Sequence, residues 1–253
     1  AGQVGGLSAA QFAVLTSDMI VELQPTAFAA IDPSIISHIS VSAIGSITDA
    51  QILQMTTGQF AALTAAQLPG FQDSQIEQFT GDQVAALDPL AFASLSATQL
   101  DHFSSSLISR ISVGAVAHMT ADQMASLDVS QFSEFTLTHL QAITAVQAVG
   151  LLASQLATIS DQEISALSVP VIAAIRASEI AGLPTATVSH LSSQQIAALS
   201  PAQLHEMTSA QLLAMTMSQV EGLRPDQIDA IAHASAQPAV TDHAGTETGP
   251  VSN

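Results

Sequence analysis

Large apolar residues recur along this chain with a period of eight. From Leu7 to Ala230 the chain divides, without insertion or deletion, into 28 units of eight residues. We call these units octads. Position 1 is Leu, Ile, Met or Phe in all 28 octads, and position 6 is a large apolar residue in 27, Ala148 being the exception. Such a repeat indicates a solenoid whose coils share one core.

Polar residues at positions 2 and 5 indicate the secondary structure. Position 2 is Ser, Thr or Asp in 22 octads, and position 5 is Gln in 16 octads and Glu in two. A Ser, Thr or Asp followed three residues later by Gln or Glu is a capping box, which marks the start of a helix. We interpret Thr64 with Gln67, and Ser200 with Gln203, as such capping boxes. Proline at position 3 in five octads suits the first residue of a helix.

Each octad is therefore predicted to form one short helix over positions 3 to 8, with position 1 of the next octad at the corner. A helix of this length is not stable alone, because its nucleation is unfavourable. Stacked coils must stabilise it. The alternation of apolar and polar residues that is typical of a strand is absent, so the sequence predicts an all-α solenoid.

Residues that recur at every fourth octad suggest the size of one coil. Phe71, Phe103 and Phe135 are spaced in this way, and so are Gly150 and Gly182. This spacing predicts four octads per coil, about seven coils (28 octads divided by four) and a square prism. Three octads per coil is the alternative, which keeps fewer such columns. We predict an N-terminal extension over residues 1–6, one solenoid domain over 7–231 and a polar tail or linker over 232–253.

The charge of the chain limits its partners. Three Arg and no Lys stand against 21 carboxylates, so the formal net charge is -18. Such a surface repels nucleic acid and anionic lipid, and we expect no nucleic-acid partner. No apolar run approaches the roughly 20 residues that span a bilayer, so we expect no membrane insertion. Cysteine is absent, which excludes disulfides and thiolate chemistry. Since the chain begins without Met, we interpret it as a processed form or a fragment.

No set of residues indicates catalysis or a cofactor. The hydroxyls of position 2 recur too regularly for nucleophiles, which need an adjacent base. Four of the eight histidines share position 8 but are expected on different coils or sides, too far apart to bind one metal ion. These are His38, His102, His118 and His190. We expect no enzyme activity, no cofactor and no metal ligands, and keep calcium between carboxylates of neighbouring coils as a weak alternative.

The octads that begin at Leu63 and Leu199 carry the motif Leu-Thr/Ser-x-x-Gln-Leu. It resembles the Leu-Thr/Ser-x-x-Gln-Ile/Val-x-Ala repeats of very large bacterial secreted and cell-surface proteins, which are often described as adhesin-like. The resemblance covers the octad array. It implies a bacterial protein, secreted or at the cell surface, with a fibre-like or adhesive role. It implies no catalytic residue, because the motif consists of capping and packing residues.

Both ends of the array keep their apolar residues, whereas a solenoid normally ends in units with a polar outer face. The residues concerned are Leu7, Phe12 and Leu15 at the start, and Leu223, Ile228 and Ile231 at the end. We predict that they stack head to tail on another copy, as in a filament subunit or a stalk. The alternative is a scaffold that presents a flat side to a cell-surface protein or glycan, through residues that depart from the octad such as Leu53, Leu152 and Arg176.

Overall fold

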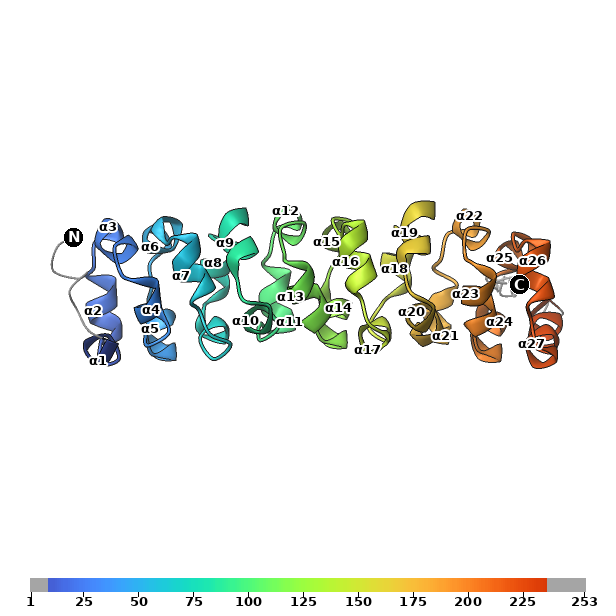
Figure 1. Cartoon of the computed structure of the whole chain (residues 1–253), viewed down its shortest axis with the longest axis horizontal. Helices are drawn as coiled ribbons and strands as arrows, with labels where there is room; N and C mark the ends of the chain where they lie inside the picture. The colour runs from blue at the N-terminus through green and yellow to red at the C-terminus, as the bar shows by residue number, and fades with distance from the viewer. Residues whose placement is uncertain (1–8, 236–253) are drawn as a thin grey trace, which may run out of the picture.

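The chain forms a straight rod of short helices, with the first helix at one end and the last at the other (Figure 1). In this computed structural model, residues 9–235 are described. They contain 27 α-helices, one 3-10 helix and no strand. The all-α solenoid that the octads predict is thereby confirmed. The predicted extension over residues 1–6, Leu7, and residues 236–253 of the predicted tail lie outside the described residues.

In chain order the helices are α1 (Ala9–Phe12), α2 (Ser17–Val21), α3 (Pro25–Ala29), α4 (Pro33–Ile36), α5 (Val41–Ile44), α6 (Asp49–Gln54), α7 (Thr57–Ala61), the 3-10 helix η1 (Leu68–Gly70), α8 (Asp73–Ile76), α9 (Gly81–Ala86), α10 (Pro89–Phe92), α11 (Ala97–Asp101), α12 (Ser105–Ile108), α13 (Val113–His118), α14 (Ala121–Ser126), α15 (Val129–Phe132), α16 (Leu137–Ala142), α17 (Ala145–Ala148), α18 (Ala153–Leu156), α19 (Asp161–Ala166), α20 (Val169–Ala174), α21 (Ala177–Ile180), α22 (Thr185–Val188), α23 (Ser193–Ala198), α24 (Pro201–Glu206), α25 (Ser209–Leu213), α26 (Met217–Glu221) and α27 (Pro225–Ser235).

Every described α-helix begins at octad position 3, as the capping pattern predicts. Most end between positions 6 and 8, as α10 and α9 do, whereas α27 continues for 11 residues. The octad of residues 63–70 differs, since it forms only η1. Pro69 at its position 7 has no N–H to donate to a helix, and this accounts for the short turn.

Positions 1 and 6 line one continuous core. From Phe12 to Leu204, every position-6 side chain is at most 3% exposed. Aromatic rings meet edge to face within this core. The ring centroid of Phe79 lies 5.2 Å from that of Phe71 in the octad before, and 4.9 Å from that of Phe60 three octads earlier. The core is therefore a single column along the rod, built from two side chains per octad.

One coil is smaller than the predicted four octads. Helices that pack on each other are three octads apart, as α3 and α6 are, or α17 and α20. Hydrogen bonds between successive coils join residues 25 to 31 positions apart, with 28 the commonest separation. These separations are longer than three octads, which span 24 residues, and shorter than four octads, which span 32. A coil therefore takes about 28 residues, or three and a half octads. The array of 28 octads thus makes about eight coils (28 divided by three and a half) rather than seven.

The physical reason lies in the open carbonyl groups at each corner. With four octads per coil, position 5 would stand over position 5 of the coil before, inside a helix. With three and a half it stands over a corner, where carbonyl groups lack intrahelical partners. The square prism is wrong for the same reason, because corners of successive coils are staggered.

Gly150 and Gly182 do not stack on each other either. A Cβ on each would instead meet Ala121 and Ala153 respectively, on the preceding coil.

Candidate functional site

A row of buried glutamine side chains joins each coil to the one before it. All fifteen position-5 glutamines from Gln51 to Gln227 accept a hydrogen bond at Oε1 from the position-2 N–H of their own octad, over 2.6 to 3.0 Å. Each Nε2 donates to the position-1 carbonyl oxygen 28 residues earlier, over 2.5 to 2.9 Å. In most of these glutamines, Nε2 also donates a hydrogen bond to the position-6 carbonyl oxygen 31 residues earlier. We call this row the glutamine ladder.

The ladder explains why the column is glutamine rather than glutamate. Either side chain can complete a capping box, but only the amide has N–H groups to donate to the carbonyl oxygens of the previous coil. Leaving such buried carbonyl groups without donors costs free energy. The sequence predicted the capping role and missed the bond between coils. The preference for 16 Gln over two Glu at position 5 was the signal that could have revealed it.

The predicted capping residues belong to this ladder. Ser200 and Gln203 form both bonds of a capping box, with N···O distances of 2.7 and 3.2 Å. Thr64 donates its N–H and its hydroxyl to Gln67 Oε1 over 3.0 and 3.1 Å. Gln67 Nε2 then donates to Ile36 O, 2.8 Å away. Ser200 and Gln203 therefore cap α24, whereas Thr64 and Gln67 close the turn that precedes η1 without capping a helix. Both glutamines also hold the coil before them.

At the C-terminal end, position-6 side chains come to the surface. Val220 is 42% exposed and Ile228 is 49% exposed, whereas the same position is buried from Phe12 to Leu204. The predicted end residues Leu223 and Ile231 are partly buried against the core. Because no further coil among the described residues covers them, these side chains present an open cross-section of the core. We call Val220, Leu223, Ile228 and Ile231 the C-terminal face.

The N-terminal end is apolar through other positions than predicted. Phe12 is fully buried, since the following coil covers it, and Leu15 is partly buried. Met19 is instead 51% exposed and Val21 is 49% exposed. We call Leu15, Met19 and Val21 the N-terminal face. Leu7, which was predicted to belong here, lies outside the described residues.

The octads that carry the N-terminal face, and those that follow it, lack the donors of the ladder. Position 5 is Gln11 in the first octad, but it is apolar in the second to fifth octads, where Met19, Ala27, Ile35 and Ala43 stand. These four side chains have no N–H group to offer to the carbonyl groups of a preceding coil. A contact made by Leu15, Met19 and Val21 would thus be apolar packing.

His139 replaces glutamine at one rung of the ladder. Its Nδ1 accepts a hydrogen bond from Thr136 N–H over 3.3 Å, and its Nε2 lies 2.9 Å from Ile111 O, 28 residues earlier. These partners assign the neutral tautomer that carries its proton on Nε2. Burial of the ring lowers the pKa of His139 below its usual value. A neutral imidazole therefore performs both tasks of the amide.

Charged side chains form ties between coils and do not form a metal centre. Within residues 9–235, no three His, Asp or Glu residues gather so as to hold a metal ion. His102 lies 2.9 Å from Glu77 and 3.3 Å from Asp73, both on the preceding coil. Hydrogen bonding to Glu77 raises the pKa of His102. Arg110 likewise forms an ion pair over 2.7 Å with Asp82 on the preceding coil.

The residues that depart from the octad are spread along the rod. Leu53 on α6 is 51% exposed and Leu213 on α25 is 86% exposed. Leu152 is partly buried before α18, and Arg176 forms an ion pair over 3.2 Å with Glu179. These four residues do not form one compact patch.

No protein-family model matches the sequence, and no curated protein is similar to it. Among solved structures, the leucine-rich repeat-containing protein LegL7 from Legionella pneumophila aligns with 90% of this chain and 89% of its own. The sequence identity is 12% and the TM-score is 0.19. A TM-score this low assigns neither a shared fold nor a function. None of the described helices is long and apolar enough to cross a membrane.

Proposed function

We propose that the chain is a non-catalytic structural rod of a bacterial extracellular assembly, and that its two faces join copies head to tail. The exposure of position 6 at Val220 and Ile228 supports this proposal, because that position is buried in every earlier coil up to Leu204. The extracellular setting rests on the likeness of the octads to repeats of bacterial surface proteins. A secreted filament subunit or a surface stalk fits both observations.

The junction follows from the chemistry of the two faces. The C-terminal face offers half-exposed aliphatic side chains, and the N-terminal face offers Met19 and Val21. Burying an aliphatic side chain fully stabilises by about 1.5 to 3 kcal/mol, and these are already partly buried. The contact should therefore be weak and dependent on protein concentration. Two unlike faces that meet without closing a ring give an open, polar filament.

Sedimentation velocity over a concentration series tests the proposal. The wild-type protein should associate further as concentration rises, and Ile228→Asp should remain monomeric, because it places a charge in the junction. Val146→Asp is the matched control, since Val146 is 75% exposed on α17 in the middle of the rod. It should associate as the wild type does. A wild-type protein that stays monomeric at every concentration contradicts the proposal, and so does equal association of both variants.

A further inference from the structure

The glutamine ladder is interrupted for one whole coil. Four consecutive octads, residues 159–190, carry Glu163, Val171, Glu179 and Thr187 at position 5. We call this stretch the ladder gap. Its helices α20, α21 and α22 also lack a side-chain hydrogen bond at the N-cap. This coil consequently rests on the preceding one mainly by apolar packing.

The two glutamates of the gap differ in their surroundings. Glu179 has its charge compensated, since Arg176 lies 3.2 Å away and Ala153 N–H donates to it over 2.8 Å. Glu163 accepts hydrogen bonds at Oε2 from the N–H and hydroxyl of Ser160, over 2.7 and 2.6 Å. Within residues 9–235 no Arg or His forms an ion pair with Glu163, and the chain has no Lys.

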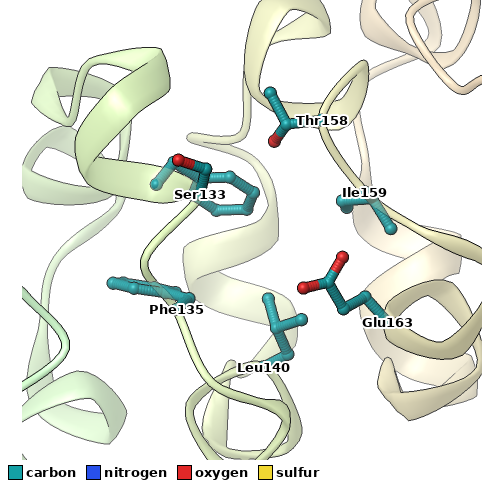
Figure 2. Close-up of a pocket in the computed structure, with 7 residues that line it drawn as sticks. Ser133, Phe135, Leu140, Thr158, Ile159 and Glu163 are labelled. Carbon is teal, nitrogen blue, oxygen red and sulfur yellow. The ribbon is translucent and has the colours of Figure 1, made fainter.

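A cavity opens where Glu163 stands in place of glutamine. Its volume is about 10 Å³, and it is partly open to solvent. It is lined by Phe132, Ser133, Phe135, Leu140, Thr158, Ile159 and Glu163. The carboxylate of Glu163 points into the space between Phe135, Leu140 and Ile159 (Figure 2).

The register of the ladder identifies the acceptors on the opposite side. Ladder nitrogens reach carbonyl groups 28 and 31 positions earlier, and the same steps back from Glu163 lead to Phe135 and Phe132. The carbonyl oxygens of these two residues take the places that receive an amide elsewhere. A carboxylate has no hydrogen to donate to them. No donor from the described residues reaches Phe135 O. Phe132 O, by contrast, already accepts the N–H of Phe135 over 3.1 Å. The site thus combines a carboxylate with one carbonyl oxygen, that of Phe135, which lacks a donor.

We propose that this cavity binds an ammonium group, either the free ion or the end of a lysine side chain of a partner. The nitrogen would donate to Glu163 Oε1 and to Phe135 O, as the ladder nitrogens donate to their carbonyl groups over 2.5 to 2.9 Å. That spacing is typical of N–H···O bonds. The rings of Phe132 and Phe135, with centroids 5.3 Å apart, add aromatic surface that favours a cation.

Metal ions suit the cavity less well. Calcium takes six to eight oxygen ligands at about 2.3 to 2.6 Å, and magnesium requires shorter octahedral contacts. One carboxylate with two carbonyl groups provides fewer than six oxygen ligands. The volume of about 10 Å³ is close to the least that holds one water molecule, so the cavity takes a single nitrogen of comparable size. The net charge of -18 also draws small cations to the surface.

Thermal unfolding in four salts at equal ionic strength tests the proposal. The salts are the chlorides of ammonium, methylammonium, potassium and tetramethylammonium, of which the last two have no N–H to donate. Ammonium at ten times its Kd should raise the Tm of the wild type by about 3 to 6 °C over tetramethylammonium. Glu163→Gln should lose this difference, because glutamine completes the ladder. Glu206→Gln, which removes the same charge from an exposed site, should keep it.

The outcomes also distinguish the sources of the ligand. A response to ammonium alone indicates the free ion, and an equal response to methylammonium indicates room for a lysine side chain. As a second readout, ammonium should shift the amide NMR signal of Ser160 in the wild type and leave it in place in Glu163→Gln. Equal Tm changes in all four salts, or the same response in Glu163→Gln as in the wild type, overturn the proposal. Neither result depends on whether the ends of the rod associate.

Discussion

A single residue type, glutamine at position 5, performs two tasks at once in this protein. Its oxygen caps its own helix, and its nitrogen satisfies corner carbonyl groups of the coil before, as Gln147 does with Thr144, Val116 and Met119. The substitutes found in the column retain different parts of this chemistry. His139 retains both tasks, whereas Glu163 retains the cap only. The donor half of the amide is therefore what binds the coils together.

Replacing Gln147 by Glu tests the donor half alone. The carboxylate can still cap Thr144 N–H, but it leaves the buried carbonyl group of Met119 without a donor and faces Met119 O and Val116 O with a negative charge. We expect Gln147→Glu to lower the free energy of unfolding by about 2 to 4 kcal/mol, measured by chemical denaturation. Gln162→Glu, on an exposed position of α19, is the control and should change it by about 0.5 kcal/mol or less. Equal effects of the two variants would refute the two-task account.

The neutral state of His139 makes one rung of the ladder sensitive to pH. Since burial lowers its folded pKa, its contribution is complete above the unfolded pKa of about 6.5. The contribution is lost as pH falls toward the folded pKa, because protonated Nδ1 can no longer accept Thr136 N–H. Between about pH 7.5 and 5, the free energy of unfolding should fall by less in His139→Gln than in the wild type. A wild-type to variant difference that is constant over this range would contradict the assignment.

At the scale of the helix, the sequence predicted most of what forms. The octad register placed the start of every described α-helix correctly at position 3, and hydrogen bonds within one octad cap most of these helices. Helix ends were less predictable, since they depend on how the chain turns toward the next side of the coil. Pro69 shows that one residue can reduce a helix to a single 3-10 turn. Local hydrogen bonding is thus readable from the sequence, and the turn angle between helices is not.

A substitution of Gly150, just after α17, tests how closely the elements of successive coils approach each other. A Cβ at this position would overlap the backbone carbonyl of Ala121 on α14, which cannot move as a side chain would. We expect Gly150→Ala to lower the free energy of unfolding by about 1 to 3 kcal/mol. Gly222→Ala is the matched control, because the nearest atom to its Cβ would be Gln219 O at 3.6 Å. That variant should be neutral or slightly more stable, and similar losses in both would argue against the packing described.

For the whole molecule, the size of the coil is where sequence reasoning was wrong. The spacing of Phe71, Phe103 and Phe135 predicts columns of residues stacked every four octads, yet the contacts between coils centre on a separation of 28 residues. In a sequence with a period of eight, every multiple of eight residues is a candidate for the length of one coil. When a coil takes a non-integer number of octads, equivalent positions of successive coils do not stack on each other. The apolar end residues were visible in the sequence. The sequence did not show which of them are exposed, because the burial of Phe12 and the exposure of Met19 depend on the direction in which the coils cover each other.

Electron microscopy of the purified chain over a concentration series tests the central claim most directly. The account predicts isolated rods at low concentration and unbranched filaments at high concentration. Their axial repeat should equal one rod length, about 70 Å for eight coils stacked roughly 8 to 10 Å apart. Isolated rods at every concentration, or rods that associate side by side, would contradict the claim that the two apolar faces join copies end to end.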